Sequence, residues 1–140
     1  MTELGHSSNL RDIETIATYD HKSRQFFIHS PTLTSTKVWI GAAGHTATHV
    51  SLLARLVVEG KFCGLNWFIV PLRNKYGVLY PGVAANYIGE KYGRQGNDNG
   101  FLQFSHYAIP AENMLSRFAK IDEQTGKFIP PADENAAYVS

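Results

Sequence analysis

Apolar and polar positions alternate, or gather in short apolar runs, along most of this 140-residue chain. Alternation places successive side chains on opposite faces of a strand, so the pattern predicts a β-rich domain. Residues 13–19 and 25–28 are two such runs, and the polar stretch 20–24 between them has the composition of a turn. These three segments predict a β-hairpin.

A second hairpin is predicted at residues 49–58 and 62–72, which flank the short glycine-containing loop 59–61. The leucines and the alanine in the first of these runs would also suit a buried helix. The tight loop and the valine pair before it favour a strand.

Three further runs predict strands, and one stretch predicts a helix. The strands are expected at 34–40, 82–88 and 101–109, with a glycine- and asparagine-rich connection at 89–100. Residues 110–119 begin with proline and carry apolar residues at helical spacing, which predicts a short closing helix. The polar tail from residue 122 onward is expected to be loosely held.

Composition indicates one domain, because 44% apolar and 12% aromatic residues can build a core. The net charge of +1 favours neither nucleic acid nor an anionic membrane as a partner. No apolar run reaches the roughly 18 residues of a membrane span, and the polar start lacks a signal-peptide core. We therefore expect a soluble intracellular protein in which Cys63 is reduced and buried.

Histidine and glycine motifs predict no metal or phosphate site. His45 and His49 have the spacing of zinc ligands on a helix, but the glutamate of that motif is missing and the segment is expected to be extended. The glycine-rich stretch 93–100 lacks the lysine and hydroxyl residue of a phosphate loop and enters a strand, so a turn is predicted. These residues alone indicate only a β-rich domain.

Several strings, in a fixed order, resemble the middle domain of the acyl-CoA oxidases. The resemblance runs from residue 1 to about residue 119. Its strings are Thr2-Glu3-Leu4-Gly5-His6, Glu14-Thr15, Ala17-Thr18-Tyr19-Asp20, Ser30-Pro31-Thr32-Leu33-Thr34-Ser35-Thr36-Lys37 with Trp39, Asp98-Asn99-Gly100-Phe101-Leu102, and Ile109-Pro110 with Asn113-Met114-Leu115. The string from Ser30 to Trp39 separates oxidases from the related acyl-CoA dehydrogenases.

The resemblance implies a fold and an activity. The fold would be mainly β, a barrel of about six to eight mostly antiparallel strands with a short helix near the C-terminus. The activity would be FAD-dependent oxidation of a fatty acyl-CoA by O₂ to the trans-2-enoyl-CoA and hydrogen peroxide, the first step of peroxisomal β-oxidation. A homodimer located in the peroxisome is implied for the full-length enzyme.

The resemblance also implies site residues. Thr2 would donate to the isoalloxazine of FAD, Trp39 would lie along the flavin, and Gly41 would offer its backbone to the ring. Ser8 matches a position that touches the CoA portion of the substrate. Trp39 could instead belong to the core, and Thr2 could be a turn hydroxyl.

The catalytic glutamate is expected outside this chain, because the family carries it in a C-terminal helical domain. We expect residues 1–121 to be the flavin-facing domain, truncated at its N-terminus, and 122–140 to lead towards that helical domain. The isolated chain should be inactive and bind flavin weakly. Alternatives are a non-catalytic binding module and a fragment of an acyl-CoA dehydrogenase. No base is assigned among Glu3, Glu14, Glu59, Glu90, Glu112, Glu123 and Glu134.

Overall fold

The computed structural model describes residues 1–93, 96–117 and 119–131, and it confirms a mainly β fold. The larger sheet has five strands in the order β5-β4-β1-β2-β8. Its strands are β1 (Ile16–Asp20), β2 (Gln25–His29), β4 (His49–Val58), β5 (Lys61–Pro71) and β8 (Tyr107–Pro110). Both predicted hairpins, β1–β2 and β4–β5, are antiparallel pairs within this sheet.

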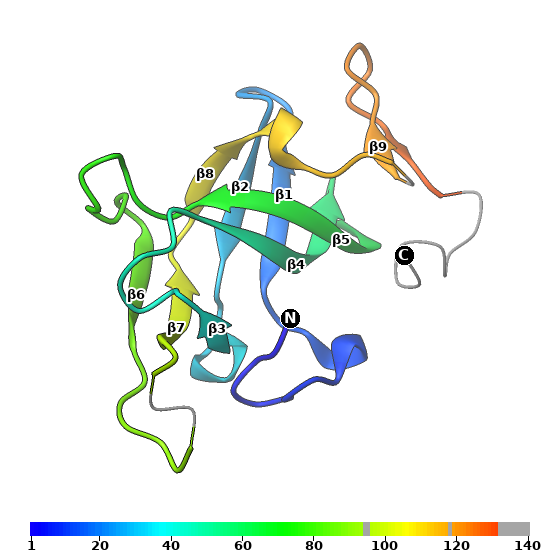
Figure 1. Ribbon diagram of the computed structural model, residues 1–140. Helices are drawn as coiled ribbons and strands as arrows, with labels where there is room; N and C mark the ends of the chain where they lie inside the picture. The colour runs from blue at the N-terminus through cyan, green and yellow to red at the C-terminus, as the bar shows by residue number, and fades with distance from the viewer. Residues whose placement is uncertain (94–95, 118, 132–140) are drawn as a thin grey trace.

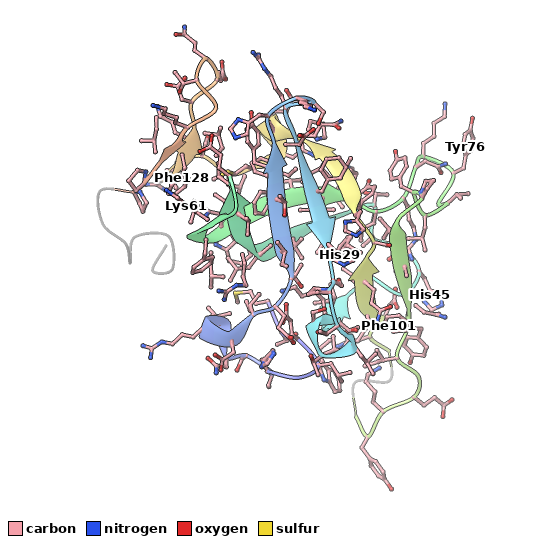
Figure 2. The ribbon with its side chains drawn as sticks, turned by 180° about the vertical axis from the view of Figure 1, so that it is seen from behind. His29, His45, Lys61, Tyr76, Phe101 and Phe128 are labelled. Carbon is pink, nitrogen blue, oxygen red and sulfur yellow. The ribbon has the colours of Figure 1, made fainter. Side chains whose placement is uncertain are left out.

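Two smaller sheets lie on either side of the larger one (Figure 1). A three-stranded sheet has the order β3-β7-β6, and a two-stranded sheet pairs β9 with β10. These strands are β3 (Lys37–Gly41), β6 (Val83–Tyr87), β7 (Asn99–Phe104), β9 (Lys120–Ile121) and β10 (Phe128–Ile129). Figure 2 shows His45 and Phe101 at the three-stranded sheet, with Lys61 and Phe128 at the opposite end of the molecule.

The predicted barrel is wrong, because within the described residues the sheets stay open. The five-stranded sheet ends at β5 and β8, and no strand pair joins these two edges. Strand β1 pairs with β4 in parallel, although the remaining strand pairs are antiparallel. A closed barrel requires every strand to have two partners. The edge strands of the five-stranded and three-stranded sheets each have only one within the described residues.

The core fills the space between the five-stranded sheet and the three-stranded sheet. The alternating burial of β2 sends Phe26 and Ile28 inward, where both are fully buried. The Phe26 ring packs edge-on against Phe68 with 5.0 Å between centroids, and Leu102 of the three-stranded sheet belongs to the same cluster. Each Å² of apolar surface removed from water contributes about 25 cal/mol to stability, and this burial holds the sheets together.

The predicted strand at 101–109 is two strands, β7 and β8. A turn at Ser105 and His106 separates them, and His106 adopts a left-handed backbone with φ of 42°. The Ser105 amide donates to the Gly82 carbonyl at 2.9 Å. The chain therefore leaves the smaller sheet and enters the larger one at this turn.

The predicted helix at 110–119 is wrong. Among the described residues of this stretch, only Ala111–Asn113 are helical, as the 3-10 turn η3. The next residue, Met114, bridges to Phe68, and the Leu115 amide donates to the Trp67 carbonyl at 2.9 Å. Pairing with β5 thus replaces the helical hydrogen bonds, since a short helix carries little stability of its own.

Three smaller predictions also need correction. The strand expected at 34–40 begins with a 3-10 turn, η2 (Leu33–Ser35), and a further turn, η1 (Leu10–Asp12), precedes β1. Cys63 is half-buried and not fully buried. The start of the tail turns back and adds β10, which pairs with β9 just before it, while residues 132–140 lie outside the described residues. Among the described helices, none has the length and apolar character of a membrane span.

Candidate functional site

The N-terminal segment is hydrogen-bonded to residues 34–38, which brings Thr2 close to the residues around Trp39. The Leu4 amide donates to the Thr36 carbonyl at 2.8 Å, and the Val38 amide donates to the Thr2 carbonyl at 3.2 Å. These bonds fix which residues of the two segments lie opposite each other. Two strings that are far apart in the sequence therefore form one surface.

The Thr2 side chain is partly buried, and its hydroxyl donates to the Val38 carbonyl. This contact uses the one proton of the hydroxyl, while the oxygen keeps lone pairs for another donor. The predicted donation from Thr2 to a flavin would require this hydroxyl to turn away from Val38.

Trp39 stands in an unusual backbone conformation. Its φ is 62°, and the pairing of β3 with β7 shifts register between Lys37 and Ile40, which marks a β-bulge. The indole is 56% exposed, so the alternative in which Trp39 belongs to the core is wrong. A left-handed non-glycine residue costs about 1–2 kcal/mol, and such outliers cluster at functional sites.

Gly41 ends β3 opposite Asn99 and leaves open space where a side chain would be. A Cβ placed on Gly41 would meet no heavy atom within 4 Å. Gly44 and Gly100, by contrast, are packed tightly, with contacts of 2.3 Å and 2.5 Å for an added Cβ. Backbone atoms surround Gly100, so glycine is required for packing there, whereas the 2.3 Å contact at Gly44 is with the movable Asp98 carboxylate. At Gly41 glycine leaves a surface unfilled.

Arg73 holds the loop that follows Gly41. Its guanidinium is buried and donates to the carbonyls of Ala43, Gly44 and Ala47 at 2.9, 3.2 and 2.8 Å. The fork of donors on arginine suits three carbonyls that converge on one point. This role was not evident from the sequence, because the contacts join residues 26 to 30 positions apart.

Glu3 and Lys37 form a fully buried ion pair with 2.9 Å between Nζ and Oε1. The Lys37 ammonium also donates to the Leu53 carbonyl at 3.0 Å. The carboxylate accepts the Glu14 amide at 2.8 Å and the Thr15 hydroxyl at 2.7 Å. Both residues stand in strings that carry the family resemblance, but their burial and pairing were not evident from the sequence.

Hydrogen bonding and burial shift the two pKa values. Burial alone would raise the pKa of Glu3, but the Glu14 amide, the Thr15 hydroxyl and the Lys37 ammonium outweigh it and hold that pKa below its ordinary value of 4.5. Burial lowers the pKa of Lys37, and Glu3 opposes this shift. The lowered pKa keeps the Glu3 carboxylate charged near neutral pH, and that charge opposes the loss of the Lys37 proton.

We expect Glu3 to make the chain sensitive to acid. A folded-state pKa below the unfolded value means that the unfolded chain binds more protons, so the contribution is complete above pH 4.5 and is lost as pH falls through the folded pKa. Urea unfolding followed from neutral pH to about pH 3 measures this loss. Glu3→Gln should show a flatter pH dependence than the exposed control Glu59→Gln, and equal slopes would contradict the assignment.

Ser8 is exposed and lies next to Ser7, whose φ is 51°. A shallow pocket of about 450 Å³ opens nearby, and Ser8 is not among its lining residues. Thr2, Trp39 and Gly41 do not line this pocket either. The pocket is lined by His6, Arg11, Asp12, Ile13, Glu14, Ile16, Pro31 and Arg55.

Three of the histidines, His6, His45 and His49, have side-chain hydrogen-bond partners. His6 contacts Glu14 at 2.8 Å, and this pair with Glu3 places three ligand atoms within 4.8 Å of one another. The lone pairs of Glu3 serve Lys37, Thr15 and the Glu14 amide, a donor set that suits hydrogen bonding better than a metal. His45 (Figure 2) contacts Asp98 at 3.1 Å, whereas His49 contacts Thr48, so these two histidines have separate partners.

No family model matches the chain, but individual proteins do. It is 50% identical over 139 residues to acyl-coenzyme A oxidase 1 of Yarrowia lipolytica, covering 99% of this chain and 20% of that protein. The crystal structure of acyl-CoA oxidase1 from Yarrowia lipolytica superposes with a TM-score of 0.89 at 49% identity, covering 93% of this chain and 19% of that one. Acyl-CoA oxidase-2 of Caenorhabditis elegans, bound with FAD, ascaroside-CoA and ATP, gives 0.92 at 36% identity, covering 98% and 21%. The chain spans about a fifth of the relatives it matches.

Proposed function

Because this chain is homologous to one segment of the acyl-CoA oxidases, we propose that it forms the flavin-facing β-domain of such an oxidase. The whole protein would oxidise a fatty acyl-CoA with O₂ to the trans-2-enoyl-CoA and hydrogen peroxide. The observation that carries the proposal is the joining of two family strings into one surface, where Trp39 is exposed and Gly41 borders open space.

The residues of this surface fit a flavin. An exposed indole can lie against a planar ring. A glycine with open space at its Cβ position lets the backbone approach that ring closely. Thr2, Trp39 and Gly41 would hold the isoalloxazine, and Ser8 would face the CoA portion of the substrate. Bound FAD supplies the hydride acceptor.

The other elements of the reaction would come from outside these residues. We assign no catalytic base to this chain, and we place the glutamate that takes the α-proton in the helical part of the oxidase. A homodimer in the peroxisome, acting in fatty acid β-oxidation, is the setting we propose. Exposed Leu4 and Leu33, at 54% and 70% exposure, would then be covered by other parts of the enzyme.

A chimeric oxidase tests the proposal. The chain would replace the homologous segment of the Yarrowia lipolytica enzyme, and FAD content and peroxide release from palmitoyl-CoA would be measured. We expect a yellow, active chimera and no peroxide from the 140-residue chain alone. A folded chimera without FAD would refute the flavin-facing role, and it would favour the non-catalytic binding module that exposed Leu33 also permits.

Gly41→Thr in the chimera should lower peroxide formation about tenfold, equivalent to roughly 1.4 kcal/mol in the barrier. A Cβ at this position meets no heavy atom within 4 Å, so the hydroxyl and methyl groups of threonine would fill space beside the flavin that oxygen otherwise uses. Peroxide release and reduction of an artificial dye would be compared, with dye reduction expected to persist. Gly96→Thr, also at an open position, is the matched control. Unchanged peroxide formation would contradict a role for this glycine in oxygen access.

A further inference from the structure

We propose that the buried Glu3–Lys37 ion pair is a positioning device that sets Thr2 and Trp39 in register with each other. This inference rests on the proposed flavin-facing role of Thr2 and Trp39. Glu3 directly follows Thr2, and Lys37 lies two positions before Trp39. The two charged residues face each other in an antiparallel bridge, with exposures of 0% and 1%.

Stability alone does not account for a buried ion pair here. Removing two charges from water costs several kcal/mol per ion, and apolar residues of similar size often stabilise a protein equally well. The Glu3 carboxylate and the Lys37 ammonium instead have specific further partners: the Glu14 amide, Thr15 and the Leu53 carbonyl. A pair of this kind favours one arrangement of the chain over its alternatives.

The alternative in question is a slip of the N-terminal segment along β3. Few backbone bonds hold this segment, and moving an extended segment by one residue turns each side chain to the opposite face. Such a slip would place the exposed Leu4 or Thr2 opposite Lys37 and leave both charges unpaired. The ion pair therefore disfavours every register except the one in which Thr2 meets Val38.

The same pair fixes the start of the bulge that turns Trp39 outward. Lys37 pairs with Leu102 on one side of the bulge, and Ile40 pairs with Gly100 on the other. Because Trp39 has the strained φ of 62°, its conformation persists only when its neighbours are held in place. Anchoring Lys37 to Glu3 links the position of the indole to that of the Thr2 hydroxyl.

The test uses the chimeric oxidase with the double variant Glu3→Leu/Lys37→Met, which replaces the pair by apolar side chains. Thermal unfolding, the FAD dissociation constant and the absorption spectrum of the bound flavin would be measured. We expect the variant to fold and the FAD dissociation constant to rise about tenfold, the effect of one lost hydrogen bond. The absorption band of the bound flavin should lose its fine structure. Glu59→Gln, which removes an exposed carboxylate, is the control and should change neither property.

The outcomes separate this inference from the function on which it rests. A parent chimera that folds without FAD would refute the proposed function and the inference with it. A parent that binds FAD, with a double variant of unchanged affinity and spectrum, would overturn the positioning role alone. If the double variant does not fold, Glu3→Asp keeps the charge but shortens the side chain: weaker FAD binding would support the role, and unchanged binding would overturn it.

Discussion

Lys37→Met is expected to lower the free energy of unfolding by about 3–5 kcal/mol. The substitution leaves the Glu3 carboxylate at 0% exposure without its counter-ion and removes the donor to the Leu53 carbonyl. A loss of this size is a large part of the stability of an ordinary domain, about 5–15 kcal/mol. Urea unfolding of the chain followed by tryptophan fluorescence measures it.

Lys61→Met is the matched control, because Lys61 is exposed at the start of β5. It should change the free energy of unfolding by less than about 0.5 kcal/mol. Adding Glu3→Leu to Lys37→Met should recover much of the loss, since the unpaired charge disappears. Equal stability of the two lysine variants would show that the buried pair does not contribute as its geometry indicates.

Gly100→Ala is expected to cost up to about 3 kcal/mol, the upper part of the usual range for overpacking. A Cβ at this position would lie 2.5 Å from the Gly44 nitrogen, 2.8 Å from the Asn86 oxygen and 2.9 Å from the Ala43 carbon. All three are backbone atoms, so no flexible side chain can move aside. Strand β7, or the loop that Arg73 holds, would have to shift.

Such a shift would also disturb the site, because Gly100 pairs with Ile40 beside Gly41. The chimeric oxidase carrying Gly100→Ala should therefore lose both thermal stability and FAD. Gly96→Ala, for which no atom lies within 4 Å, serves as the control. A Gly100→Ala chain as stable as this control would mean that the close packing is not maintained in solution.

Local patterns were sufficient for the two hairpins. The alternating residues of β1 and β2 and the polar turn between them identify a hairpin without any distant contact. The strand at 49–58 was located correctly from its tight loop and valine pair. At 110–119 the same approach failed, because the bond from Leu115 to Trp67 joins segments that are distant in sequence.

The sequence by itself determined that this chain is β-rich and that it resembles the oxidase middle domain, since alternation and ordered strings can be read locally. Only the tertiary structure decided that the sheets stay open, that Trp39 faces outward from a bulge, and that Glu3 and Lys37 pair in the interior. Charged residues are usually exposed, so composition gives no sign of a buried pair. Its burial depends on Thr15 and Leu53, residues that only folding brings to Glu3 and Lys37.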